Sequence, residues 1–292
     1  MREIFERNFL EEFVRRIFMM NTIDYGEIWK TMMSESKKTN FESDRFWTME
    51  EAVKYDTQIK MDNWNFSKSL IQRLDFTTDS KVLDIGSGPG TLTIPLAGMV
   101  KHVTAVEPSD GMLYCLKENI KAMGLNNVSW IQKKWEDVDI KDLDAPYDVV
   151  VASFSLAMPD IREAVIKMNN VSSKYVYLNW FAGMPSWEKT YAEAWQRVHG
   201  TPYNIYPQID CVYKVLYDMG IYPNITVYPD YWELVYPEME DAVTHYKRIV
   251  NATTAEHEEI LKKYISETFS CENGDVRMKE KSYTAWLWWE KS

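Results

Sequence analysis

Short runs of continuously apolar residues recur along the middle and the end of this chain, and stretches with the spacing of amphipathic helices separate them. A run that is apolar on both faces is typical of a strand buried in a parallel sheet. The alternation of such runs with helices predicts an α/β fold. The spacing predicts seven strands, at residues 82–85, 102–106, 128–131, 147–154, 174–180, 225–236 (interrupted by a turn or bulge at Pro229 and Asp230) and 282–289.

The first 75 residues precede this pattern and read as helices. Apolar residues recur there every three or four positions, which makes an apolar stripe along a helix. A polar loop is expected at 34–40, followed by helices over about 46–64 and 66–74. We therefore divide the chain into an N-terminal helical cap, residues 1–75, and a core, residues 76–292. The stripe that begins the cap consists of Ile4, Phe5, Phe9, Phe13, Ile17 and Phe18.

Residues with capping preferences mark the helix boundaries in the core. Asp110 is expected to cap the helix after the second strand, and Gly124 to end it. Asp160 and Glu163 form a capping box, which is a structural role. Gly220 is expected to end another helix. Later helices are expected at 209–219, 241–250 and 255–269.

The first strand leads into a turn that contains three glycines, and then into a helix. Gly86, Gly88 and Gly90 allow the backbone to pass close to a ligand, because glycine has no Cβ. A strand, a glycine turn and a helix start are the parts of a nucleotide site at the carboxyl end of a sheet. Thr91 stands where the dinucleotide fingerprint requires its third glycine, which argues against NAD.

Two acidic residues indicate what kind of nucleotide fits this turn. Asp84 precedes the turn, where its carboxylate would repel a pyrophosphate but attract an ammonium group. Glu107 ends the second strand about twenty residues further on, at the position from which an acid binds a ribose diol. An adenosine that carries a cation in place of phosphates fits both acids.

The run Asp84-Ile85-Gly86-Ser87-Gly88-Pro89-Gly90 resembles the first motif of the class I S-adenosylmethionine-dependent methyltransferases. The resemblance implies a doubly wound, mostly parallel, seven-stranded Rossmann-like sheet whose last strand is antiparallel and inserted beside the sixth. It also implies S-adenosylmethionine as the cofactor and S-adenosylhomocysteine as its product. The run would then face the methionine moiety of the cofactor, and Glu107 with its neighbour Pro108 would face the ribose.

The same resemblance points to contacts with the adenine and the methyl group. In the family, an acid after the third strand usually binds the adenine amino group, but Lys134 stands at that position here. We therefore transfer the adenine contact to Trp135 and Glu136, with burial of Trp135 in the core as the alternative. Ser153 belongs to the end of the fourth strand, where the family presents residues to the methyl group and the acceptor. The Asn/Asp-Pro-Pro-Tyr/Phe sequence typical of enzymes that methylate amide or adenine nitrogens is not found there, which disfavours a nucleobase acceptor.

Aromatic residues are concentrated outside the nucleotide motif. In the cap, Tyr55 and Trp64 resemble residues with which such enzymes cover the methionine end of the cofactor, and packing of the cap onto the core is the alternative. An aromatic-rich insertion follows the fifth strand at about residues 181–208. It predicts either an aromatic-walled acceptor site or packing of the insertion onto the core. The helix face that the insertion presents carries Trp187, Tyr191 and Trp195.

A catalytic base is needed only if the acceptor must lose a proton. Tyr191 and His199 are weak candidates for that role, and His245 and Glu193 are further ones, since none of them lies in a diagnostic motif. No His, Asp or Glu spacing matches a metal site. The three cysteines are too few and too scattered for a disulfide framework or a zinc site, and they are Cys115, Cys211 and Cys271.

Composition and charge limit the class of partner. The net charge of -11 and the pI near 5.0 argue against nucleic acid, because binding to phosphates requires a positive surface. No apolar run is long enough to span a membrane, and the start of the chain does not resemble a signal peptide. We therefore expect a cytoplasmic protein without a nucleic-acid or membrane partner. Its oligomeric state is not predicted.

Together these observations predict an S-adenosylmethionine-dependent methyltransferase that modifies a small molecule or an accessible protein side chain. One alternative is a non-catalytic protein that binds S-adenosylmethionine or S-adenosylhomocysteine as a structural or sensing ligand. A second alternative is a nicotinamide-dependent oxidoreductase, against which Thr91 argues. The sequence does not identify the acceptor or the atom that receives the methyl group.

Overall fold

The computed structural model describes residues 23–39, 47–272 and 274–291. Helices precede the first strand, as the sequence predicts, and they are α2 (Tyr25–Ser36), α4 (Met49–Met61) and α5 (Asn65–Ile71). Helix α2 continues into the segment that was expected to begin a polar loop. The apolar stripe predicted for the start of the chain lies outside the described residues. No described helix is both long and apolar enough to cross a membrane.

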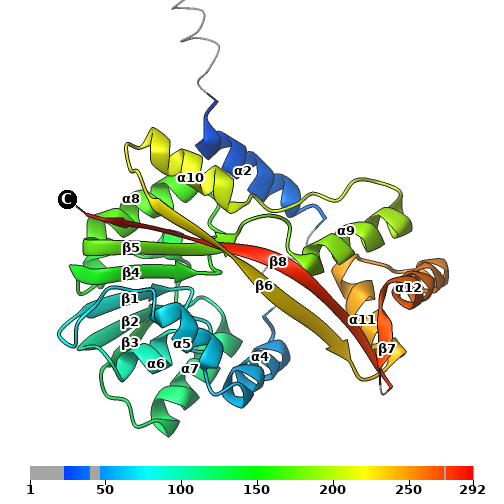
Figure 1. Cartoon of the computed structure of the whole chain (residues 1–292), viewed down its shortest axis with the longest axis horizontal. Helices are drawn as coiled ribbons and strands as arrows, with labels where there is room; N and C mark the ends of the chain where they lie inside the picture. Colours follow the sequence, from blue (N-terminus) through cyan, green and yellow to red (C-terminus); the bar gives the residue numbers. More distant parts are fainter. Residues whose placement is uncertain (1–22, 40–46, 273, 292) are drawn as a thin grey trace, which may run out of the picture.

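One mixed sheet organises the fold (Figure 1). Seven strands follow each other in the order β3-β2-β1-β4-β5-β8-β6, and a short strand, β7, pairs with the start of β8. Strands β1 to β5 are parallel, and β8 is antiparallel to both of its neighbours. The predicted mostly parallel sheet with its last strand inserted beside the sixth is therefore confirmed. The strands are β1 (Lys81–Ile85), β2 (His102–Val106), β3 (Val128–Ile131), β4 (Tyr147–Ser153), β5 (Ser172–Phe181), β6 (Asn224–Tyr236), β7 (Ser270–Glu272) and β8 (Asp275–Glu290).

Both faces of the sheet are covered because successive residues of each strand point to opposite sides. Leu83 and Val150 belong to the core under α8 and α10, whereas their neighbours Val82 and Val149 belong to the core under α5 and α6. This explains why the parallel strands are apolar at nearly every position. The helices around them are α6 (Thr93–Ala97), α7 (Asp110–Ala122), α8 (Ile161–Val171) and α10 (Ile209–Asp218), and the short turn η1 (Trp135–Asp137) follows β3.

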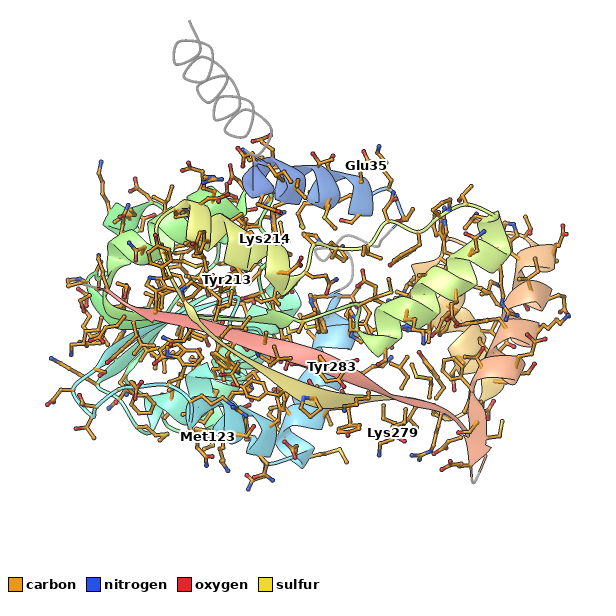
Figure 2. The ribbon with its side chains drawn as sticks, turned by 45° about the horizontal axis from the view of Figure 1, so that its top comes forward. Glu35, Met123, Tyr213, Lys214, Lys279 and Tyr283 are labelled. Atoms are coloured by element: carbon orange, nitrogen blue, oxygen red, sulfur yellow. The ribbon has the colours of Figure 1, made fainter. Side chains whose placement is uncertain are left out.

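Helix α2 is attached to the outer face of this layer, beside α10 (Figures 1 and 2). The Trp29 indole is fully buried and donates to the carbonyl of Met158 at 2.7 Å. The Lys214 ammonium of α10 lies over the ring of Tyr25 at 4.6 Å from its centre, a cation–π contact. These contacts fix α2 on the side of the sheet opposite to α4.

The predicted helix boundaries are largely confirmed. Gly124 and Gly220 follow α7 and α10 with φ of 63° and 74°, a conformation that favours glycine. The Asp160 carboxylate accepts from the Glu163 N–H at 3.1 Å and so caps α8. The prediction for Asp110 was wrong, because the preceding residue, Ser109, is the N-cap and its hydroxyl accepts from the Met112 N–H.

The structure contradicts the turn or bulge that was predicted at Pro229 and Asp230, because the register with β8 is unbroken there. Both residues lie inside one continuous strand, β6, where they pair with Tyr283 and Ser282 of β8. Proline is tolerated there because β6 is the edge of the sheet, so the missing N–H interrupts no inner ladder.

Strands β6 and β8 extend well beyond the rest of the sheet. The last pair between β5 and β8 is Phe181 with Thr284, whereas β6 and β8 remain paired as far as Tyr236 and Val276. The strand predicted at 282–289 is thus only the inner half of β8. We call the outer part, residues 229–236 paired with 276–283, the arm (Figures 1 and 2).

A second hydrophobic core lies against the arm, separate from the two faces of the main sheet. Helix α9 (Ser186–His199), inside the predicted insertion, supplies Tyr191, Ala194 and Val198 to it. Helices α11 (Met239–Ile249) and α12 (Ala255–Thr268) supply most of the remainder, and their positions agree with prediction within two residues. The insertion therefore does not pack alone, because its partners come from the chain after β6.

The N-terminal helices meet the sheet layer where α4 crosses the start of α7. A Cβ on Gly111 would stand 3.0 Å from both the Met49 Cα and the Ala52 Cβ, and 3.1 Å from the Thr48 carbonyl. Two of these atoms belong to the backbone, so they cannot turn away as a flexible side chain would. The close approach of α4 to α7 depends on this glycine.

We predict that Gly111→Val lowers the free energy of unfolding by roughly 1–3 kcal/mol, because the larger side chain forces α4 away from α7. Urea unfolding followed by circular dichroism measures the change. Gly98→Ala is the control, since its Cβ would meet only the Pro95 carbonyl at 3.6 Å and should leave stability nearly unchanged. Equal stability of the Gly111 variant and the native chain would contradict the close approach.

Candidate functional site

The glycine turn lies where β1 leaves the sheet, beside the end of β2. Gly86, Gly88 and Gly90 have φ of 70°, 56° and 95°, in the region that L-residues rarely adopt. The N–H groups of Gly86 and Ser87 donate to the Val106 carbonyl at 2.7 and 3.1 Å. The turn is therefore held by β2, and the three predicted glycines are each required by the backbone.

The end of β4 closes on the same turn. A Cβ on Gly86 would lie 2.3 Å from the Ser155 Cβ, which leaves no room for any side chain at position 86. The Ser155 hydroxyl donates to the Ile85 carbonyl at 2.6 Å. Ser153 stands at the end of β4, where its hydroxyl accepts from the Asn179 amide at 3.1 Å. The structure thus brings Ser153 to the same edge as the glycine turn.

Asp84 lies beneath the turn instead of at its surface. Its side chain is 2% exposed, and it accepts a hydrogen bond from the Thr93 hydroxyl at 2.6 Å. Burial raises the pKa of Asp84 to about 6. The carboxyl group therefore ties the end of β1 to the start of α6, and its contact with an ammonium group stays a prediction.

Glu107 lies directly against the middle of the turn. One carboxylate oxygen accepts from the Gly88 N–H at 2.9 Å, and the other accepts from the Ser109 N–H at 2.8 Å. Pro108, between them, is exposed. These bonds fix the carboxylate at the carboxyl end of β2, adjacent to the turn, as the sequence predicts.

The glycine turn offers a ligand both a hydrogen-bonding group and open space. The buried Ser87 hydroxyl oxygen has no hydrogen-bond partner among the described residues. At Gly88, an added Cβ would approach only the Met112 sulfur at 3.9 Å and the Thr91 hydroxyl at 4.0 Å. A carboxylate, an unsatisfied hydroxyl and an open glycine together fit a ligand that carries hydroxyl groups.

A buried polar network ties α4 and α7 to this turn. The Asn119 amide of α7 donates both to the Asp56 carboxylate at 2.7 Å and to the Pro89 carbonyl at 2.9 Å. Next to Asp56, the Tyr55 hydroxyl forms a hydrogen bond with Thr91, while burial raises the pKa of Tyr55. The structure therefore places Tyr55 at the turn.

Trp64 is placed differently. It packs beside the apolar cluster that contains Ile94 and Leu116, the side chains that a Cβ on Gly90 would strike. Trp64 thus contributes to the attachment of the cap, which was the alternative stated for it. Its contact with a cofactor stays a prediction.

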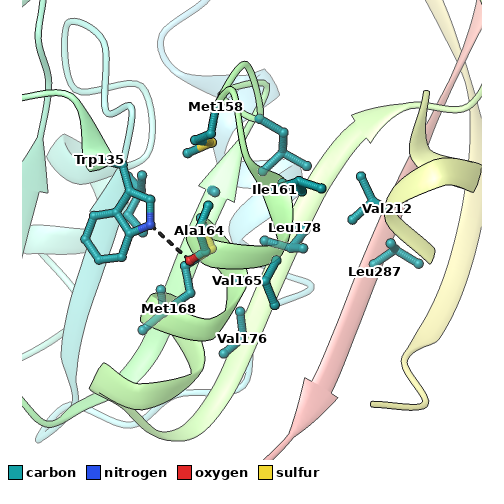
Figure 3. Close-up of a cluster of buried hydrophobic side chains, with 14 of the residues drawn as sticks. Trp135, Met158, Ile161, Ala164, Val165, Met168, Val176, Leu178, Val212 and Leu287 are labelled. Atoms are coloured by element: carbon teal, nitrogen blue, oxygen red, sulfur yellow. Dashed lines mark hydrogen bonds between the residues drawn. The ribbon is translucent and has the colours of Figure 1, made fainter. Parts of the chain in front are cut away.

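The indole of Trp135 packs in the core (Figure 3). It is 3% exposed and donates to the Ala164 carbonyl at 3.1 Å. The Lys167 ammonium of α8 donates to the carbonyls of Glu136 and Val138, at 3.1 and 2.9 Å, and so fixes the backbone of η1 to α8. Any adenine contact of Trp135 would therefore have to come from its backbone, whereas the Glu136 side chain is exposed.

Aromatic rings form a row from the end of β4 to the second core. Phe154, which follows β4, has its ring centre 5.3 Å from that of Phe181 at the end of β5. Phe181 lies 5.7 Å from Trp187, and Trp187 lies 5.7 Å from Tyr191. The row starts one residue before Ser155, which touches the glycine turn. Part of the predicted aromatic face of α9 is thus joined to the turn.

The proposed bases do not lie together. The Tyr191 hydroxyl lies 2.9 Å from Nε2 of His245, whose pKa is lowered to about 4 by burial and by the charges of Arg248 and Lys54. The low pKa keeps the His245 imidazole neutral near pH 7, and its Nε2 shares a hydrogen bond with the Tyr191 hydroxyl. His199, at the other end of α9, donates to the Val250 carbonyl at 2.7 Å. Within the described parts of the chain, no group of metal-ligand side chains converges.

Sequence reasoning missed Glu188, in the first turn of α9 directly after Trp187. Its side chain is 1% exposed, and one carboxylate oxygen accepts from the Tyr206 N–H at 3.1 Å. Burial raises the pKa of Glu188 to about 7. In the sequence it resembles an ordinary acid in the first turn of a helix, so only its predominantly aromatic neighbourhood could have signalled it.

We predict that Glu188→Gln stabilises the protein by roughly 2–3 kcal/mol at pH 8. The native pKa lies above the ordinary value of 4.5, so ionisation penalises the folded state, and the penalty grows as the pH rises from about 4.5 to 7. Urea unfolding at pH 4 and pH 8 measures it, and the two proteins should differ little at pH 4. A variant that is less stable than the native chain at pH 8 would contradict the prediction, because it would show that the fold stabilises the charged carboxylate of Glu188.

Comparison with known proteins identifies the region around the turn. Residues 82–174, which contain the glycine turn, Glu107 and Ser153, match the family model of a methyltransferase domain. An uncharacterized protein of Haemophilus influenzae is 37% identical over 114 residues, which are 39% of this chain and 41% of that protein. A protein-L-isoaspartate O-methyltransferase of Pectobacterium atrosepticum is 31% identical over 99 residues, 34% of this chain and 45% of the relative. The matches thus span less than half the length of these relatives.

Solved structures share the fold over a larger part of the chain. The YcgJ protein of Bacillus subtilis superposes with a TM-score of 0.53 at 14% identity, over 77% of this chain and 98% of the other. A putative methyltransferase from Bacillus halodurans superposes with a TM-score of 0.52 at 18% identity, with the same coverage of both chains. At these identities the likeness establishes the fold alone.

Proposed function

We propose, from the match of residues 82–174 to the model of a methyltransferase domain, that the chain transfers the methyl group of S-adenosylmethionine to an acceptor. The observation that carries the proposal is the Glu107 carboxylate fixed against Gly88 at the carboxyl ends of β1 and β2. In an α/β sheet, an acid at that place is suited to a ribose diol. The acceptor is a small molecule or an accessible protein side chain.

The residues present fit this cofactor. Glu107 would accept hydrogen bonds from the ribose hydroxyls. The Ser87 hydroxyl, which has no partner among the described residues, would form a hydrogen bond with the bound cofactor. Asp84 and Tyr55 are the candidates for the methionine moiety: the Asp84 carboxylate accepts from the Thr93 hydroxyl, and the Tyr55 hydroxyl bonds to Thr91. When bound, the sulfonium supplies an electrophilic methyl group.

The protein's part in such a reaction is mainly positioning. An in-line displacement requires the acceptor atom to stand opposite the departing sulfur, and holding the two in line supplies a large share of the rate. The ends of β4 and β5, with Ser153, Phe154 and Phe181, provide a largely apolar border next to the turn. That border would exclude water from the methyl group.

We predict that Glu107→Ala weakens the binding of S-adenosylmethionine and S-adenosylhomocysteine by roughly 1–3 kcal/mol, because charge-assisted hydrogen bonds to the ribose are lost. Isothermal titration calorimetry measures the affinity, and a thermal melt confirms folding. Glu118→Ala, an exposed acid on the next helix, is the matched control and should bind as the native chain does. Unchanged affinity of a folded Glu107 variant would refute its role.

The same titrations separate the alternatives. Binding of both sulfur ligands without binding of NAD excludes the oxidoreductase, for which Thr91 removes the third glycine of the fingerprint. Methyl transfer from a labelled donor to an acceptor then separates an enzyme from a non-catalytic binding protein. Failure to bind either sulfur ligand in a folded sample would overturn the proposed function.

A further inference from the structure

Glu188 directly follows Trp187, a member of the aromatic row that starts beside the glycine turn. It lies in the first turn of α9, shortly after β5 ends at Phe181. The rings of Phe154, Phe181 and Trp187 connect the end of β4 with this turn of α9. Ring contacts therefore join Trp187, the residue before Glu188, to the end of β4.

The Glu188 carboxyl group is buried, and among the described residues no cationic side chain pairs with it. Its one hydrogen bond among the described residues comes from the Tyr206 N–H. Burial and the nearby charge of Glu188 both raise the pKa of Tyr203. A buried carboxylate that no described cation neutralises is costly to the fold unless a positive partner arrives from outside.

The hydrogen bond from the Tyr206 N–H does not explain why an ionisable acid, instead of a neutral side chain, occupies position 188. A neutral glutamine could accept from the Tyr206 N–H equally well, so an ionisable group is not needed to hold this loop. Aromatic faces, in contrast, attract cations, and they do so most strongly where water is excluded. The pairing of an acid with electron-rich rings therefore matches a positively charged ligand.

We propose that the methyl acceptor carries a positively charged nitrogen, and that Glu188 binds it together with the rings of Trp187, Tyr203 and Tyr206. That the bound ligand is the methyl acceptor rests on the proposed function. That Glu188 binds a cation does not depend on it. Glu188 acts here by binding and orienting the acceptor, and no proton transfer is part of the proposal.

The test is calorimetric titration of the full chain, in the presence of S-adenosylhomocysteine, with two organic cations and their uncharged analogues. The pairs are choline with dimethylbutanol and benzylamine with benzyl alcohol, so that each pair differs mainly in charge. We expect at least one cation to bind at least about tenfold more tightly than its analogue. Absence of binding by both cations, or equal binding of both analogues, would overturn the proposal.

Two variants assign the binding to the buried acid. Glu188→Gln keeps the acceptor for the Tyr206 N–H and should lose about tenfold or more in affinity for the cation. Glu240→Gln, on helix α11, is the control, because its carboxylate is exposed and has no part in the proposed site. Equal cation affinity of the folded Glu188 variant and the native chain would refute the role of Glu188.

Titration with S-adenosylhomocysteine alone distinguishes failure of this inference from failure of the proposed function. If that ligand binds the native chain and the Glu188 variant alike while neither cation binds, only the inference fails. If a cation binds through Glu188 while the sulfur ligand does not bind, the proposed function fails and the cation site remains, without its role for an acceptor.

Discussion

The contact between Gly86 and Ser155 is the constraint on which the arrangement of the site depends. Gly86 has no Cβ, so the backbone of the glycine turn can pack directly against the end of β4, where a Cβ would clash with Ser155. The bond from the Ser155 hydroxyl to the Ile85 carbonyl fixes this approach. Phe154 then turns through a positive φ of 54°, which directs the chain out of the sheet and places its ring beside Phe181. One close approach thus sets the turn, the border of β4 and the start of the aromatic row.

Features that depend on neighbouring residues could be predicted from the sequence, whereas those that depend on distant partners could not. Gly124 and Gly220 were located correctly because a left-handed residue at a helix end is a local requirement. The turn predicted at Pro229 failed because its pairing with Tyr283, more than fifty residues later, overrides local turn chemistry. In the site, the glycines and acids of the motif were found by their spacing, but Glu188 was not, because its meaning depends on the loop that carries Tyr206.

The second core holds the insertion in place through helix α9. Helix α9 has one end at the carboxyl edge of β5 and the other among α11, α12 and the arm, so the rings along it are anchored by a rigid support. A further link crosses from the N-terminal helices, where Glu51 of α4 pairs with Arg248 of α11 at 3.1 Å. The parts that border the proposed acceptor position are therefore held to one another from both ends of the chain, although the acid between them destabilises the fold.

The place of β8 in the sheet also governs the order in which the protein can assemble during synthesis. Strand β6 has β8 as its only neighbour in the described sheet, and β8 alone joins it to β5. While residues 275–290 are still being made, β1 to β5 can pair, but β6 has nothing to pair with and the arm does not exist. The nascent chain must therefore carry an unpaired, partly apolar strand until the ribosome has passed β8, which exposes it to aggregation at that stage. An early half that carries the glycine turn and a late half that carries the arm follow directly from one strand order.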